Sequence, residues 1–223
     1  MEIYSIDLLC IQETHICETE HFITDQGNLV IFSGTTGWKY AGVGFIISAK
    51  LRKSVYSFDC PNGRMAAVKI RVTGGKIAFL SMYAPPNDHP IEERSLFFTQ
   101  LESFYNSISV NGEKFLCGDL NARLRCRYAN EDDIIGEYFF RGVKKLPELQ
   151  ANRNFLMQFC HTTGTLLANT FFSNDADKLI TYHEISAKPM DPIQDNKFAQ
   201  LDFRLCGTTG LSAMARIESI RRL

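Results

Sequence analysis

The chain has 223 residues, of which 45% are hydrophobic and 22% are charged. This composition is typical of a globular protein and excludes a disordered or collagenous one. Lysine plus arginine total 24 and aspartate plus glutamate total 25, so the net charge is −1 and any nucleic-acid contact must use a local basic patch. There is no run of about 18 apolar residues and no basic region before Gln12, so we expect no membrane-spanning helix, no membrane partner and no signal peptide.

The cysteines and histidines give no sign of a structural metal. The seven cysteines include no CxxC pair, and the five histidines show no ligand spacing. Cys10, Cys117 and Cys206 lie inside apolar runs, where a thiol behaves as a small hydrophobic group. We therefore expect reduced thiols in an intracellular protein, nuclear or cytoplasmic, without structural zinc.

Short apolar runs bounded by Gly, Asn, Asp and Pro predict many strands. In chain order these are Ile6–Gln12, Leu29–Phe32, Gly42–Ser48, Met65–Val72, Lys76–Tyr83, Lys114–Cys117, Thr165–Asn169, Leu179–Tyr182 and Gln200–Cys206. Thr73-Gly74-Gly75 separates two of these strands, which predicts a hairpin over Met65–Tyr83.

Two segments have helical periodicity instead of strand character. Ile91–Ser109 and Gln150–Thr163 each carry apolar residues on one stripe, and Gly164 is suited to end the second helix. Leu120–Leu149 and His183–Ala199 are the longest irregular stretches, and loops of that length are often functional. Strands that pair in sequence, with a few helices between them, predict an α+β layered sandwich.

Polar residues follow several strands at the point where the apolar run stops. Glu13 follows the first strand, Tyr83 ends the hairpin, and Asp119 and Asn121 follow Lys114–Cys117. In an extended backbone, the spacing of Asp119 and Asn121 sends both side chains to one side. Together with Glu13 they offer the hard oxygen ligands that Mg²⁺ prefers. Each residue alone is more often an ordinary turn or surface residue, so the signal lies in their combination.

Four segments together resemble the ordered motifs of the endonuclease/exonuclease/phosphatase superfamily. They are Leu9-Cys10-Ile11-Gln12-Glu13-Thr14, Tyr83-Ala84-Pro85, Cys117-Gly118-Asp119-Leu120-Asn121-Ala122 and Gln200-Leu201-Asp202-Phe203. Within the superfamily, the chain most resembles the apurinic-type endonuclease domain of non-LTR (LINE-like) retrotransposons. Asn152–Leu156, the stretch through Leu166–Phe172, and Thr181-Tyr182-His183 resemble further segments of that subgroup.

This resemblance implies a four-layer α/β/β/α sandwich of the DNase I-like type over residues 1–206, with a divergent tail over residues 207–223. It implies that Glu13 binds metal, that Tyr83 contacts the scissile phosphate and that Asp119 positions or deprotonates the attacking water. Asn121 would stabilise the phosphate oxyanion, and Asp202 would orient a catalytic histidine. The implied activity is nicking of DNA with Mg²⁺, or with Mn²⁺ in its place, beside a reverse transcriptase domain in the parent element.

The chain also departs from the superfamily pattern at both ends. No Asn precedes Glu13, and no Ser-Asp-His motif follows Asp202, since the last histidine is His183. The first strand and the final catalytic strand are therefore expected to be missing, and the tail reads as a turn and a short basic helix over Met214–Arg222. We expect weak Mg²⁺ binding and little or no nicking of supercoiled DNA by this chain as it stands.

Basic residues alternate directly after Asn121. Arg123, Arg125 and Arg127 would lie on one side of an extended segment, near a phosphate backbone, and are candidate nucleic-acid contacts. Acidic residues follow closely, so a solvated loop is the equal alternative.

Two other functions remain open at this stage. The chain can be a relic that keeps the fold, with metal or nucleic-acid binding but no catalysis. It can also be a phosphoinositide or sphingomyelin phosphodiesterase, or a deadenylase, of the same superfamily.

Overall fold

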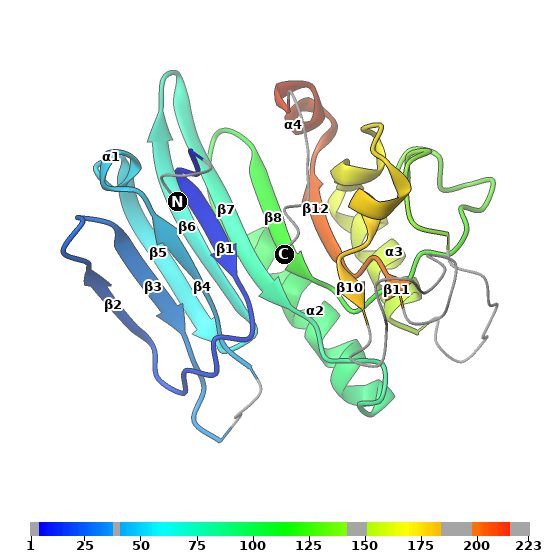
Figure 1. Cartoon of the computed structure of the whole chain (residues 1–223), viewed down its shortest axis with the longest axis horizontal. Helices are drawn as coiled ribbons and strands as arrows, with labels where there is room; N and C mark the ends of the chain where they lie inside the picture. Colours follow the sequence, from blue (N-terminus) through cyan, green and yellow to red (C-terminus); the bar gives the residue numbers. More distant parts are fainter. Residues whose placement is uncertain (1–4, 38–40, 142–150, 184–197, 215–223) are drawn as a thin grey trace. The chain divides into compact units, whose positions relative to one another are not determined.

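The computed structural model describes residues 5–37, 41–141, 151–183 and 198–214 (Figure 1). The chain divides into two compact units, each of which is described by itself. The first unit holds Met1–Ala84 and Phe104–Asp119, and the second holds Pro85–Ser103 and Leu120–Leu223. No helix of the described residues is both long enough and apolar enough to cross a membrane.

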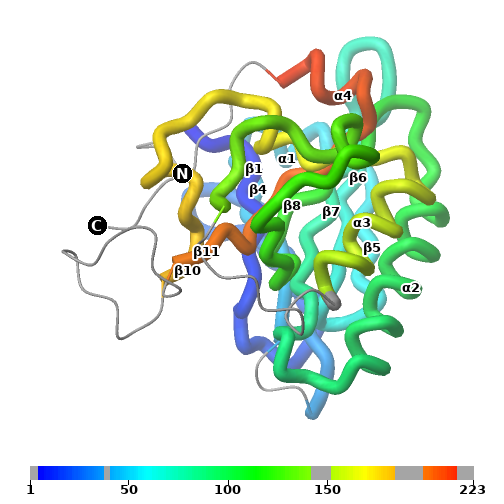
Figure 2. Tube along the Cα trace, turned by 90° about the vertical axis from the view of Figure 1, so that its right-hand side faces the viewer, coloured from blue at the N-terminus to red at the C-terminus, as the bar shows by residue number. Residues whose placement is uncertain are grey.

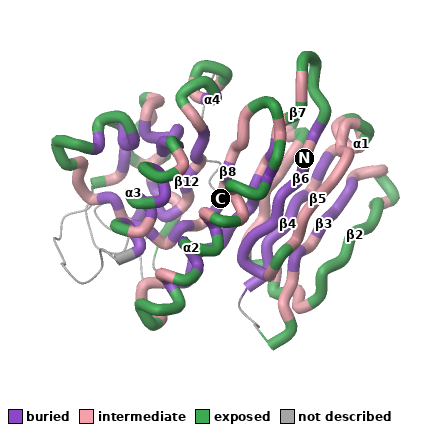
Figure 3. Tube along the Cα trace, turned by 180° about the vertical axis from the view of Figure 1, so that it is seen from behind, coloured by how far each residue is buried: buried purple, intermediate pink, exposed green. Residues whose placement is uncertain are grey.

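The first unit contains an antiparallel sheet in the order β1-β4-β3-β2. Its strands are β1 (Leu8–Ile11), β2 (Glu20–Ile23), β3 (Leu29–Ser33) and β4 (Val43–Ile47). The inner strands β3 and β4 are largely buried, whereas every residue of the edge strand β2 is exposed (Figure 3). A short helix, α1 (Ala49–Arg52), follows β4 and is capped by the side chain of Ser48.

A second sheet of this unit places β5 (Val55–Asn62), β6 (Met65–Val72), β7 (Gly75–Tyr83) and β8 (Lys114–Asp119) in sequence order (Figure 1). β6 and β7 form the predicted hairpin, with Val72 opposite Gly75 and Gly74 in the left-handed region at φ +87°. β8 runs parallel to β7, so both strands end at the same edge of the sheet. The site described below begins at that edge.

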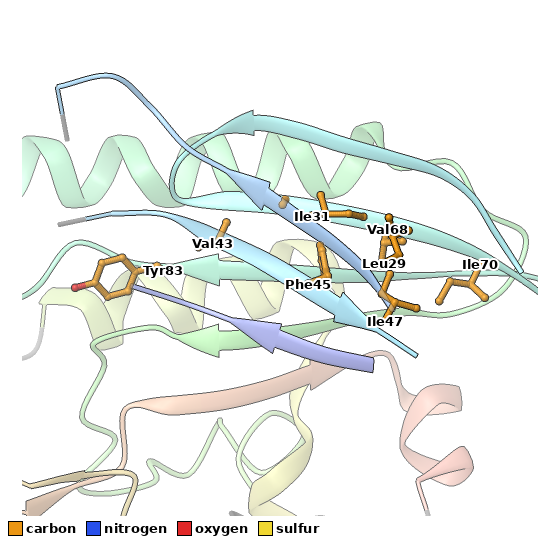
Figure 4. Packing of buried hydrophobic residues seen from close by; sticks show 9 residues of the cluster. Leu29, Ile31, Val43, Phe45, Ile47, Val68, Ile70 and Tyr83 are labelled. Atoms are coloured by element: carbon orange, nitrogen blue, oxygen red, sulfur yellow. The ribbon is translucent and has the colours of Figure 1, made fainter. Parts of the chain in front are cut away.

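The core of the first unit lies between these two sheets. Alternate residues of β3, β4 and β6 meet there and are almost fully buried, as the alternation of strand side chains requires. They are Leu29, Ile31, Val43, Phe45, Ile47, Ala66, Val68 and Ile70. Tyr83 closes one end of this cluster (Figure 4). An apolar core therefore supports the base of the tyrosine ring.

The second unit contains most of α2 (Ile91–Ser107) and the whole of α3 (Ala151–Thr163), which lie side by side (Figure 2). The rings of Phe98 and Phe155 join the two helices, with centroids 5.8 Å apart. Gly164, at φ +65°, ends α3 as predicted.

The rest of the second unit is made of short elements. β9 (Leu166–Leu167) pairs with β12 (Asp202–Cys206), and β10 (Tyr182–His183) pairs with β11 (Phe198–Ala199), both antiparallel. The described residues of this unit also form two 3-10 helices, η3 (Ala168–Thr170) and η4 (Ala176–Leu179), and the helix α4 (Thr208–Ala213).

The expected strands and helices are mostly present, with three kinds of difference. β2 and β5 were not predicted, because β2 is exposed along its length and β5 carries polar residues and Pro61 in place of an apolar run. The predicted strand Thr165–Asn169 is wrong beyond Leu167, where the chain turns into η3. The predicted strand Leu179–Tyr182 is wrong except at Tyr182, because η4 extends to Leu179 and β10 begins only at Tyr182. The expected basic helix in the tail lies outside the described residues, apart from Met214.

Candidate active site

The site in the first unit is built on the paired ends of β7 and β8. Tyr83 and Asp119 are partners in the last position of the parallel ladder. The backbone N–H of Ala84 donates to the carbonyl oxygen of Asp119 at 2.8 Å, which extends the pairing by one step. A Cβ atom on Gly118 would lie 1.9 Å from the carbonyl oxygen of Met82, so only glycine lets the strands approach here.

Glu13 reaches the same unit from the loop that follows β1. Its backbone has φ +52°, a left-handed conformation that is uncommon outside glycine. The loop is held by two backbone hydrogen bonds, from the N–H of Thr14 to Gly42 at 3.1 Å and from the N–H of His15 to Ala41 at 3.1 Å. Gly42 has φ +109° and lies against Thr14, so a side chain at this position would collide with the loop. Strain of this kind is often stored at functional sites.

Hydrogen bonds join the end of β1 to the middle of β7. The side-chain amide of Gln12 donates to the hydroxyl of Ser81 at 2.9 Å, and that hydroxyl donates to the carbonyl of Ile11 at 3.1 Å. Because Ser81 is two residues before Tyr83 on β7, these bonds place the residue after Gln12 near the tyrosine. The Glu13 carboxylate accepts a hydrogen bond from the Tyr83 hydroxyl.

Burial and neighbouring charges shift the pKa of Tyr83. Burial raises the pKa of Tyr83 well above its ordinary value, and the hydrogen bond to Glu13 and the negative charges of Glu13 and Asp119 raise it further. The positive charge of Arg64 acts in the opposite direction. The phenol therefore remains protonated at neutral pH and donates to Glu13, with the charge of Asp119 also acting on it.

The donor set of this cluster suits a hard divalent cation. Glu13 is exposed and Asp119 is half-buried, and both act on the same hydroxyl. Within the described ranges, no group of three or more His, Cys, Asp or Glu side chains lies close enough together to hold a metal. Mg²⁺ needs fewer protein ligands than that, because it is commonly held by one or two carboxylates and completes its shell with water and substrate phosphate.

Asn121 lies in the second unit, in the loop that follows β8. The expectation that Asp119 and Asn121 share one side depends on an extended backbone, and the backbone of Asn121 is left-handed, with φ +48°. Asparagine tolerates this conformation better than most residues. The Asn121 carbonyl accepts hydrogen bonds from the side-chain amides of Asn87 at 2.8 Å and Asn152 at 3.4 Å. The side chains of Asn87 and Asn152 therefore hold the left-handed turn at Asn121.

Asp202, at the start of β12, lies beside the same loop within the second unit. The N–H of Leu120 donates to the carbonyl of Leu201 at 3.0 Å. Asn121 and Asp202, which follow these two residues, are therefore neighbours. The hydroxyl of Thr181 accepts from the N–H groups of Leu201 and Asp202 at 2.9 and 3.1 Å. The side-chain amide of Asn169 donates to the Asp202 carbonyl at 3.4 Å.

The three arginines after Asn121 do not form the expected row. Arg125 has φ +56°, which breaks the extended alternation. Arg127 pairs with Asp132 at 3.0 Å and donates to a loop carbonyl, so it is committed to internal structure. Arg123 lies over the ring of Tyr182, 5.7 Å from its centroid. Burial lowers the pKa of Arg123, and the charge of Arg125 lowers it further, so these two cations lie close together.

Sequence reasoning missed a buried support beneath this loop. Arg153 of α3 donates to the carbonyls of Leu124 and Cys126 at 3.1 and 3.0 Å and forms a buried ion pair with Glu131. Asn152 is fully buried and donates to the carbonyl of Pro85 at 2.8 Å. The Asn152–Leu156 segment resembles a subgroup motif, and that resemblance was the available signal, although it did not reveal what these side chains do.

Comparisons with known proteins agree with the resemblance at the level of the fold. No family model matches the chain. An endonuclease/exonuclease/phosphatase family protein from Leptotrichia buccalis covers 92% of this chain and 77% of its own, at 14% identity and a TM-score of 0.59. The endonuclease domain of TRAS1, a telomere-specific non-LTR retrotransposon, covers 95% of this chain and 77% of its own, at 14% identity and a TM-score of 0.55.

The chain therefore has the α+β sandwich fold of the endonuclease/exonuclease/phosphatase proteins, and the predicted fold is confirmed. Among curated proteins, it is similar to Craniofacial development protein 2 of Bos taurus, at 23% identity over 206 residues. The match covers 92% of this chain but only 32% of that relative, so the chain spans about a third of the length of the relative.

Proposed function

We propose that this chain carries a phosphodiesterase site that hydrolyses DNA with the help of a divalent metal. The observation that carries the proposal is the cluster at the ends of β7 and β8, in which the Tyr83 hydroxyl donates to Glu13 and lies within the field of Asp119. A hydrogen-bond donor together with two carboxylates suits a phosphate ester, because the donor stabilises negative charge and a carboxylate orients or deprotonates water.

Each residue of the cluster would have a separate part in the reaction. The Asp119 carboxylate would accept a proton from the attacking water. When substrate binds, the Tyr83 hydroxyl would transfer its one donated hydrogen bond from Glu13 to a phosphate oxygen, and its raised pKa keeps the proton in place at neutral pH. Glu13 would hold Mg²⁺, with Mn²⁺ as the alternative metal. The bound metal would neutralise charge on the phosphate. The parts of Asn121 and Asp202 rest on the superfamily resemblance alone.

DNA is the substrate that the second unit favours. Arg123 lies over the half-exposed ring of Tyr182, and the charge of Arg125 acts on Arg123. Guanidinium groups bind phosphate and aromatic rings stack on bases, a combination common to nucleic-acid binding proteins. The TRAS1 domain, which has a similar fold, is the endonuclease domain of a retrotransposon, and this agrees with the choice of DNA. The resemblance to retrotransposon endonucleases also predicts a reverse transcriptase domain as partner.

A substrate comparison tests the proposal. The purified chain would be incubated with Mg²⁺ and either supercoiled plasmid, a phosphoinositide or sphingomyelin, and the products would be measured. Slow relaxation of plasmid that Asp119→Ala abolishes, without lipid hydrolysis, is the expected result. Faster turnover of a lipid would favour the phosphoinositide or sphingomyelin alternative. DNA binding without hydrolysis of any substrate would favour the relic.

A further inference from the structure

A buried cation lies beside Tyr83, and the roles proposed above leave it unused. Arg64 stands immediately before β6 and is only 8% exposed. Arginine is seldom buried unless its charge is compensated or used. The guanidinium group remains charged at any physiological pH, so this position keeps a permanent positive charge inside the first unit.

Arg64 makes three different contacts with Tyr83. Its carbonyl accepts from the Tyr83 backbone N–H at 2.9 Å, and its Nη1 donates to the Tyr83 carbonyl at 3.4 Å. Its guanidinium carbon lies 5.4 Å from the centroid of the Tyr83 ring, within the range of a cation–π contact. Backbone and ring of the same tyrosine are therefore held by one residue.

The turn that carries Arg64 is itself rigidly held. The Arg64 N–H donates to the side-chain oxygen of Asn62 at 2.9 Å, and the N–H of Gly63 donates to the hydroxyl of Thr35 at 2.7 Å. The carbonyl of Gly63 accepts from the N–H of Gly42 at 2.7 Å, and Gly42 also supports the loop of Glu13. The turn therefore links Arg64, which contacts Tyr83, to the loop of Glu13, which accepts the hydrogen bond of the Tyr83 hydroxyl.

We propose that Arg64 is a positioning residue, which holds the Tyr83 ring so that its hydroxyl points to Glu13 and keeps positive charge beside the two carboxylates when an anionic phosphodiester enters. This inference rests on the proposed function for the identity of the substrate. The placement of the ring rests on the contacts of Arg64 alone. Lysine cannot replace arginine here, because a compact ammonium group does not cover the ring and reach the carbonyl together.

Fluorine NMR of the protein labelled with 3-fluorotyrosine tests the placement directly. The chain has eight tyrosines, and Tyr83→Phe assigns the resonance that disappears. We expect Arg64→Met and Arg64→Lys to move or broaden the Tyr83 resonance and leave the others in place. Arg71→Met is the matched control, because Arg71 lies over the ring of Tyr56 at 4.9 Å and should affect Tyr56 alone. A Tyr83 resonance that stays at its wild-type position in Arg64→Lys would overturn the proposal, and this milder variant also serves if Arg64→Met does not fold.

Kinetics with bis(p-nitrophenyl) phosphate test whether the placement matters for hydrolysis. Loss of a supporting contact of this kind costs roughly 10–100-fold in activity, so we expect Arg64→Lys to lower kcat by that factor with little change in KM. In a Tyr83→Phe background the same substitution should have no further effect. An equal loss in both backgrounds would show that Arg64 does not act through Tyr83. If the wild type does not hydrolyse the ester, the proposed function fails, while the NMR result still decides the placement.

Discussion

Tyr83 and Asp119 are cross-strand partners at the last position of the parallel β7–β8 ladder, 36 residues apart in sequence. This pairing places a phenol and a carboxylate side by side at one edge of the sheet, where the chain leaves regular structure. Functional side chains placed this way are fixed by backbone hydrogen bonds of the scaffold.

The stability of the protein should depend on Tyr83 in a pH-dependent way. The pKa of Tyr83 is raised from its ordinary value of 10.0, so above that pH the unfolded chain releases this proton while the folded chain keeps it. Its contribution to stability is therefore full below about pH 10 and is lost as pH rises further. Wild type should exceed Tyr83→Phe by about 0.5–1.5 kcal/mol at pH 7, the usual net contribution of a hydrogen bond. Urea unfolding of both proteins from pH 7 to 11 should show this difference narrow, and a constant difference would contradict the assignment.

The left-handed conformation of Asn121 predicts an unusual order of variants. Alanine at φ +48° pays a steric cost of about 1–2 kcal/mol that glycine avoids. We expect Asn121→Gly to unfold at higher denaturant concentration than Asn121→Ala, although glycine normally destabilises. Ala122→Gly, at a neighbouring buried position, is the control and should be destabilising. The opposite order at Asn121 would mean that the backbone is not left-handed in solution.

The buried ion pair of Arg153 and Glu131 predicts a strongly asymmetric mutational response. Their side chains are only 3% and 7% exposed. Arg153→Met leaves the Glu131 charge buried without its partner and should cost about 3–5 kcal/mol of unfolding free energy. Adding Glu131→Gln should recover part of that loss, which thermal or urea unfolding would measure. A double variant less stable than Arg153→Met would show that the pair is not the source of the effect.

Metal binding should depend on Glu13 and be weak. The carboxylates of Glu13 and Asp119 are the donors that this cluster offers, and the rest of the Mg²⁺ shell would be water. Calorimetric titration should give weak Mg²⁺ binding that Glu13→Gln removes. Glu18→Gln, an exposed glutamate of the same loop, should leave binding unchanged. Tight binding that survives Glu13→Gln would place the metal elsewhere.

Much of the fold could be predicted because its signals are local. The hairpin over β6 and β7 follows from two apolar runs around a Gly-Gly turn, and α3 follows from apolar periodicity that ends at Gly164. The strand β2 could not be predicted in the same way. Its residues are exposed, and it forms because β3 offers it a hydrogen-bonding edge, which is a non-local cause.

The candidate site shows the same division between local and non-local information. Glu13, Tyr83 and Asp119 could be selected because each stands where an apolar run ends. Arg64 carries no such sign, because its importance comes from a contact with a residue 19 positions away. The arrangement of the arginines after Asn121 could not be predicted for a related reason, since a single left-handed residue, Arg125, interrupts the extended alternation on which a row of arginines depends.

The most direct test of the account is Mg²⁺-dependent hydrolysis of bis(p-nitrophenyl) phosphate by the wild type and Asp119→Ala. The p-nitrophenolate group leaves without a proton, so this ester does not need the histidine that is absent after Asp202 in this sequence. Removal of a general base typically costs about 10²–10⁴-fold. We predict hydrolysis by the wild type and by the control Asp133→Ala, and a loss of that size in Asp119→Ala. Equal rates for the wild type and Asp119→Ala, or no hydrolysis by the wild type, would contradict the proposed active site.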